Sequence, residues 1–173
     1  MAIYVELNWS HFDDWAICAS DGVAVIGPAL EAACTKWLDR TGYAVRTIDF
    51  RSGIKAAMSE LDTLLQWKVR FGSELGVHTG LGALADAFQS TPLSNGRFVL
   101  KILGAERAWH EDSRFFSGLL FILRTLTRQH LIFDHRFFTL LVLEDAQRVP
   151  GESGYDALFS DPRDRVILSG LSS

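Results

Sequence analysis

Residues 98–103 read Phe-Val-Leu-Lys-Ile-Leu, and residues 137–143 read Phe-Phe-Thr-Leu-Leu-Val-Leu. Both runs are almost continuously apolar, which is typical of strands that are covered on both faces of a sheet. Residues 114–129 lie between them and form a helical pattern that is apolar nearly all round, so we expect this helix to lie deep in the fold. A helical crossover between two strands joins them in parallel. The two runs therefore predict an α/β fold with a parallel sheet.

The sequence before these runs continues the same pattern. Residues 44–50 alternate like a strand, residues 52–71 carry apolar side chains at helical spacing, and residues 81–89 form a short helix. The order over residues 44–143 is thus strand, helix, short helix, strand, helix, strand. We expect three parallel strands packed by helices, because right-handed crossovers place helices over the sheet.

The two ends of the chain differ from this central domain. Residues 1–43 are expected to form an N-terminal extension with two short strands, one over residues 2–7 and one over residues 16–19 or 23–26, and a helix over residues 29–39. A hairpin-type turn separates residues 16–19 from residues 23–26. Residues 144–173 are rich in Gly, Pro, Ser and Asp and are expected to form a C-terminal tail.

The composition is that of a packed globular protein. The chain has 173 residues, of which 48% are hydrophobic and 22% are charged. Its two cysteines, Cys18 and Cys34, are too few for a disulfide framework, which favours a reducing compartment. The N-terminus lacks the pattern of a signal peptide, and the most apolar run, residues 119–123, is too short to span a membrane. We therefore predict a soluble, cytoplasmic protein that does not bind a membrane.

The net charge of −4 is unevenly distributed. Residues 1–27 carry a charge of −4, residues 28–143 carry +3, and residues 144–173 carry −3. Proteins that bind nucleic acids usually present a concentrated basic face, and the chain has no run rich in Lys and Arg. We therefore predict no direct contact with nucleic acid.

The chain contains no recognisable catalytic or metal-binding motif. His110-Glu111-Asp112 lacks the second histidine that a zinc-binding helix carries four residues away. His130 and His135 are five residues apart, a spacing that does not place two ligands on one helical face. Nucleophile elbows, phosphate-binding loops and dinucleotide-binding glycine patterns are absent from the sequence. We predict that the protein is not an enzyme and that it uses no metal and no cofactor.

Residues 75–88 read Leu-Gly-Val-His-Thr-Gly-Leu-Gly-Ala-Leu-Ala-Asp-Ala-Phe. This segment, with the order of elements around it, resembles the family of barstar, the small intracellular inhibitor of the bacterial ribonuclease barnase. In that family a loop with aromatic residues and glycine precedes a helix of the form Asn-Leu-Asp-Ala-Leu-Trp-Asp-Cys-Leu. The matching positions are Leu81, Ala83, Leu84 and Asp86. The resemblance covers about residues 44–143 and implies a three-stranded parallel sheet packed by helices.

The resemblance also implies a function. Barstar-like proteins are inhibitors, or immunity proteins, that occlude the active site of a toxin in a stoichiometric complex, and the toxin expected here is a nuclease. Acidic side chains of the loop and helix fill the basic cleft of the nuclease, where a carboxylate forms charge-assisted hydrogen bonds in place of a phosphate. Carried over by position, the partner-binding residues are Leu81, Gly82, Ala85, Asp86 and, in the loop, His78 and Thr79.

Five positions depart from the pattern of the family, among them Gly76 and Val77, which stand where its loop carries aromatic residues. Gly82 stands at a second acidic position of the helix, and Ala85 stands at its aromatic position. Arg124 stands where the family places an additional acid in the following helix. These departures favour a cognate toxin other than barnase.

Two other functions remain open from the sequence. The loop over residues 72–80 contains three glycines before a helix and could bind a small ligand or an anion, although such glycines more often serve to form turns. The chain could also be an interaction domain that inhibits nothing. In both cases Asp86 would be a solvated carboxylate.

Overall fold

The computed structural model describes residues 22–76, 79–90, 96–133 and 135–144. In chain order its elements are β1 (Val23–Ile26), α2 (Pro28–Arg40), β2 (Ala44–Asp49), the short 3₁₀ turn η2 (Phe50–Ser52), α3 (Ile54–Leu65), α4 (Trp67–Phe71), α5 (Leu81–Gln89), β3 (Arg97–Leu103), α6 (Ala105–Glu111), α7 (Ser113–Ile132) and β4 (Arg136–Val142). The strands predicted at residues 2–7 and 16–19 and the tail beyond residue 144 lie outside the described residues.

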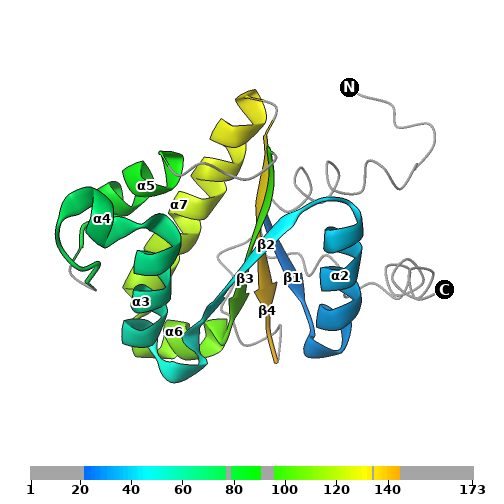
Figure 1. Cartoon of the computed structure of the whole chain (residues 1–173). Coiled ribbons are helices and arrows are strands. Elements are labelled where there is room, and N and C mark those ends of the chain that lie inside the picture. The colour runs from blue at the N-terminus through cyan, green and yellow to red at the C-terminus, as the bar shows by residue number, and fades with distance from the viewer. Residues whose placement is uncertain (1–21, 77–78, 91–95, 134, 145–173) are drawn as a thin grey trace.

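The described strands form one parallel sheet in the order β1-β4-β3-β2 (Figure 1). Ala44 of β2 pairs with Phe98 of β3, and Val23 of β1 pairs with Thr139 of β4. The α/β fold with a parallel sheet is confirmed, but the prediction of three strands is wrong. The outer edge of β4 would leave backbone N–H and C=O groups without partners, and β1 supplies them from the segment predicted to be an extension.

Helices cover both faces of this sheet. The chain passes from β1 at one edge to β2 at the other edge through α2, and then returns strand by strand through the later helices. Because right-handed crossovers that run in opposite directions put their helices on opposite faces, α2 covers one face and α3 to α7 cover the other (Figure 1).

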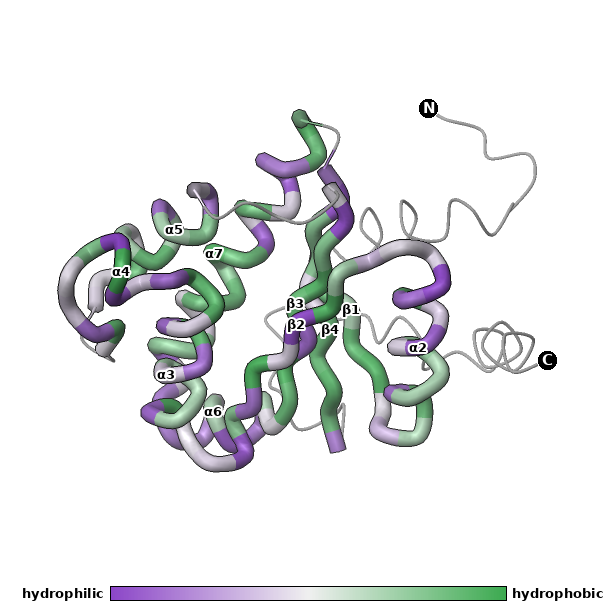
Figure 2. The backbone as a smooth tube through the Cα atoms, viewed as in Figure 1, coloured by the Kyte–Doolittle hydropathy of each residue, from purple (hydrophilic) through white to green (hydrophobic). Residues whose placement is uncertain are grey.

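The core is accordingly divided into two clusters, one on each side of the sheet. The larger cluster joins β2, β3 and β4 to the helices from α3 to α7, and the smaller one joins the opposite face of the strands to Cys34, Trp37 and Leu38 of α2. Figure 2 shows hydrophobic residues along most of β1, β3 and β4, as expected for strands covered on both faces. Lys101 interrupts the apolar run over residues 98–103 of β3, and its side chain is only 11% exposed.

Several helix boundaries differ from the predictions. The helix predicted over residues 52–71 is divided into α3 and α4 at Gln66, which has a left-handed backbone with φ of 50°. The short helix α6 was not predicted at all. In contrast, α5 begins and ends where the sequence pattern places it.

The helix α7 is the longest of the described helices. It begins where Asp112 accepts a hydrogen bond from the backbone N–H of Phe115 at 2.9 Å, which caps its first turn. The expectation that it lies deep in the fold is wrong, because Phe121 is 71% exposed and Ser117, Thr125 and Arg128 share its exposed side. None of the described helices is both long enough and apolar enough to cross a membrane.

Candidate functional site

The helix α5 is held in place by apolar side chains on one side. Leu84, Ala87 and Phe88 are buried in the larger cluster, because residues three and four apart share one face of a helix. Leu81 and Ala85 are half-buried and pack against the same cluster. The opposite side of α5 is exposed, and it carries Gly82, Ala83, Asp86 and Gln89.

The C-terminus of α5 is tied to the preceding helices by Arg70. Its guanidinium donates hydrogen bonds to the carbonyl oxygen of Ala87 at 3.2 Å and to the hydroxyl of Ser90. Ser90 in turn donates its hydroxyl to the carbonyl oxygen of Asp86 at 2.6 Å. Carbonyl groups at the end of a helix lack partners within the helix, so this arrangement fixes the last turn, on which Asp86 lies.

The helix α5 lies beside α7 at two points. A Cβ atom at Gly118 would clash with the Cδ1 atom of Leu81, so glycine allows the close approach of the two helices. Further along, Gln89 donates a hydrogen bond to Gln129 at 2.8 Å. Phe121 follows Gly118 by about one turn of α7, and its side chain is 71% exposed.

We call Gly82, Asp86, Gln89 and Phe121 the α5 face. The carboxylate of Asp86 has no hydrogen bond or ion pair to any residue that the structure describes. A Cβ atom at Gly82 would have no neighbour within 4 Å, so the surface one turn before Asp86 is open. The α5 face is thus a surface of short side chains with one carboxylate and one exposed aromatic ring.

The other predicted partner-binding residues lie in different surroundings. Thr79 is half-buried, and its backbone N–H and its hydroxyl form two hydrogen bonds with the backbone of Gly76, at 2.8 and 3.1 Å. His78 lies outside the described residues. Thr79 therefore shapes the turn before α5, and among the predicted residues of α5 only Gly82 and Asp86 are exposed.

Phe121 was not among the residues that the sequence indicated, and Arg124 was named there only as a departure from the pattern of the barstar family. The continuous apolar pattern of α7 does not distinguish Phe121, whose side chain is 71% exposed, from its buried neighbours. Arg124 is half-buried and lies almost one turn beyond Phe121. The side chain of Phe121 is thus more exposed than that of Arg124.

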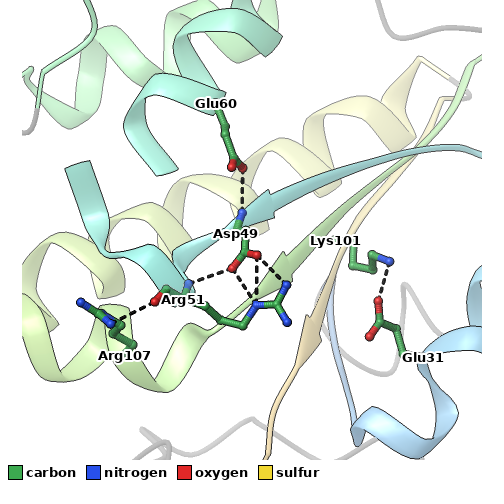
Figure 3. Close-up of polar contacts among 6 residues, drawn as sticks. All are labelled: Glu31, Asp49, Arg51, Glu60, Lys101 and Arg107. Carbon is green, nitrogen blue, oxygen red and sulfur yellow. Dashed lines mark hydrogen bonds and ion pairs between the residues drawn. The ribbon is translucent and has the colours of Figure 1, made fainter. Parts of the chain in front are cut away.

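A second group of charged residues lies at the carboxyl ends of the strands (Figure 3). Asp49, at the end of β2, accepts hydrogen bonds from the backbone N–H of Arg51 at 2.8 Å and from its guanidinium at 2.6 to 3.0 Å. The backbone N–H of Asp49 donates to Glu60 of α3 at 2.8 Å, and Arg107 of α6 donates to the carbonyl oxygen of Arg51 at 3.0 Å. These contacts join β2 to α3 and α6.

Charge pairing shifts the pKa values within this group. Hydrogen bonds from the side chain of Arg51 lower the pKa of Asp49, outweighing the opposing effect of burial. The same pair raises the pKa of Arg51, with smaller contributions from Glu31 and Glu144. On the α2 side of the sheet, the ammonium of Lys101 lies 2.7 Å from the carboxylate of Glu31 (Figure 3). Each charged group drawn in Figure 3 has a partner within the protein, so these contacts stabilise the fold.

The described residues offer little to a metal ion or to a nucleophilic mechanism. They contain no group of three or more His, Cys, Asp or Glu side chains that could hold a metal. Burial raises the pKa of the Cys34 thiol to about 12, although Lys101 opposes the shift, and a thiol that stays protonated is a poor nucleophile. Burial, and the nearby His135, lower the pKa of His130.

Comparisons with known proteins give this site no precedent. No family model matches the chain, and neither the curated proteins nor the solved structures provide a match.

Proposed function

We propose that this protein is an inhibitor of a cognate toxin, a nuclease, and that it binds the toxin through the α5 face in a stoichiometric complex. The observation that carries the proposal is the carboxylate of Asp86. It is exposed, it has no partner among the described residues, and its helix is fixed in the fold at both ends.

The chemistry of a nuclease suits such a surface. A nuclease cleft that binds phosphates presents Arg, Lys or His side chains, and a carboxylate placed among them forms charge-assisted hydrogen bonds. Opposite charges on the two proteins also accelerate their encounter. Gly82 leaves room for a cleft wall to approach α5, and the exposed ring of Phe121 on α7 offers an apolar contact.

The order of elements from β2 to β4 also supports the proposal. The resemblance to the barstar family implies the order strand, helices, α5, strand, helices and strand, and the elements follow this order. One fold can carry many functions, however, so the proposal depends on the α5 face.

The test uses three purified proteins: wild type, Asp86→Arg and Asp39→Arg. Asp39 is an exposed aspartate of α2, on the opposite side of the sheet, and it controls for the change of charge. Each protein is used to capture partners from a lysate of the source organism, and the nuclease activity of any captured protein is then titrated with each inhibitor. We expect full inhibition at a one-to-one ratio by wild type and Asp39→Arg, and none by Asp86→Arg.

Other results would contradict this proposal. If Asp86→Arg inhibits as well as wild type, the α5 face is not the interface. If the captured protein has no nuclease activity, the chain is an interaction domain of another kind. For Asp86→Ala we expect the complex to weaken by about 2–5 kcal/mol, the usual effect of truncating one partner of a buried charge pair.

A further inference from the structure

A cavity of about 530 Å³ lies apart from the α5 face, between α3 and the segment that follows it. Its volume is in the range of cavities that bind small molecules. The lining residues are Lys55, Met58, Ser59, Asp62 and Thr63 of α3, Lys68 of α4, and Glu74, Leu75 and Gly76. Met58 and Leu75 are buried and form its apolar wall.

Most charged groups of the cavity already have partners in the protein. The carboxylate of Asp62 accepts a hydrogen bond from the backbone N–H of Leu75 at 2.7 Å. The ammonium of Lys68 pairs with Glu74 at 3.1 Å. These contacts hold the segment after α4 against α3 and so form one side of the cavity.

Two lining groups have no such partner. The ammonium of Lys55 and the hydroxyl of Ser59 form no hydrogen bond or ion pair with the described part of the chain. Lys55 and Ser59 are four residues apart on α3 and therefore lie on the same side of the helix. A cation and a hydroxyl are thus available beside an apolar wall.

We propose that this cavity binds a small organic monocarboxylate with a short apolar body. The carboxylate pairs with Lys55 and accepts a hydrogen bond from Ser59, while the apolar body packs against Met58 and Leu75. A phosphate dianion fits less well, because its second negative charge would lie near the carboxylates of Asp62 and Glu74. This site is independent of toxin binding.

Three probes of equal chain length test the proposal: hexanoate, hexan-1-ol and hexyl phosphate. Each is titrated into the ¹⁵N-labelled full-length protein while the amide resonances of Ser59, Leu75 and Gly76 are followed. We expect hexanoate to shift these resonances saturably and to bind more tightly than the other two probes. We expect Lys55→Met to weaken hexanoate binding about tenfold, because it removes one charge-assisted hydrogen bond.

Lys36→Met, at an exposed lysine of α2, is the matched control and should bind hexanoate as wild type does. The melting temperature of each variant checks that it is folded. Equal binding of hexanoate by Lys55→Met and wild type would overturn the proposal, as would hexan-1-ol binding as tightly as hexanoate. Tighter binding of hexyl phosphate would overturn the choice of a monocarboxylate, and absence of saturable binding would overturn the site.

Discussion

Asp49 and Asp86 are the same residue type in opposite situations. Asp49, at the end of β2, accepts hydrogen bonds from the backbone and guanidinium of Arg51, and its pKa is lowered as a result. Asp86, on α5, is exposed and has no such contact within the described residues. The carboxyl ends of the strands therefore use their charged groups to stabilise the fold, whereas the α5 face leaves its charge available to a partner.

The largest loss of stability is expected from a substitution at Gly104, which joins β3 to α6 beside Arg51. Gly104 has φ of +67°, and a Cβ atom there would come within 2.6 Å of the backbone nitrogen of Arg51. Gly104→Ala combines left-handed strain with a backbone clash, so we expect it to lower the free energy of unfolding by about 3 kcal/mol. Urea denaturation measures this change.

Gly42→Ala is the control for backbone strain alone. Gly42 has φ of +82°, and a Cβ atom there would have no neighbour within 4 Å, so we expect a loss of only about 1 kcal/mol. Equal losses for the two variants would mean that the contact between Gly104 and Arg51 contributes nothing.

The next largest loss of stability is expected from substitutions in the pair of Glu31 and Lys101. The side chain of Lys101 is 11% exposed and that of Glu31 is 32% exposed. Glu31→Gln leaves a buried ammonium without a counter-charge, which we expect to cost about 2 kcal/mol in unfolding free energy. Lys101→Met leaves a carboxylate that can turn toward water, so its cost should be smaller. A greater loss for Lys101→Met than for Glu31→Gln would contradict this ranking.

A smaller effect, dependent on pH, is expected at Asp49. Since its pKa is lower in the folded protein than the value of about 3.9 for an unfolded chain, its contribution to stability is complete above that value. The contribution is lost as the pH falls through the folded-state pKa. The difference in unfolding free energy between wild type and Asp49→Asn should therefore be largest near neutral pH and shrink below about pH 4. A difference that stays constant from neutral pH to acid would show that the charge of Asp49 does not stabilise the fold.

The smallest effect on stability is expected at Asp86. Because its carboxylate has no partner among the described residues, Asp86→Ala should change the free energy of unfolding by less than about 0.5 kcal/mol. Thermal and urea denaturation give this value directly. A loss as large as that of Glu31→Gln would make Asp86 a structural residue and remove the basis for the α5 face.

Patterns in the sequence predicted the elements that depend on neighbouring residues. The predictions for β3, β4 and the bounds of α5 agree with the structure. The positions of buried side chains follow the period of the helix or strand, so they leave a recognisable pattern of apolar residues in the local sequence. Gln66 was not recognised as a helix break, since glutamine favours helices and a left-handed backbone is uncommon for it. The helix α6 was missed because seven residues give too short a pattern.

Features that join distant parts of the chain could not be predicted in this way. Residues 23–26 looked like a strand, but no local signal indicates that β1 pairs with β4. The contacts of Lys101 with Glu31 and of Arg107 with Arg51 depend on the same long-range assembly. Of the candidate site, Gly82 and Asp86 were identified from the resemblance, and the exposure of Phe121 became known only from the packing of α7.

The pairing of β1 with β4 also has a consequence for the order of folding. β1 is the first strand described, and its only neighbour in the described sheet is the last one. During synthesis β1 leaves the ribosome long before β4. It therefore has no strand partner in the described sheet until almost all of the described chain has emerged. Contacts of such high contact order slow folding, because a long loop must close before they form. The final step in assembling the described sheet should therefore be the docking of its earliest strand.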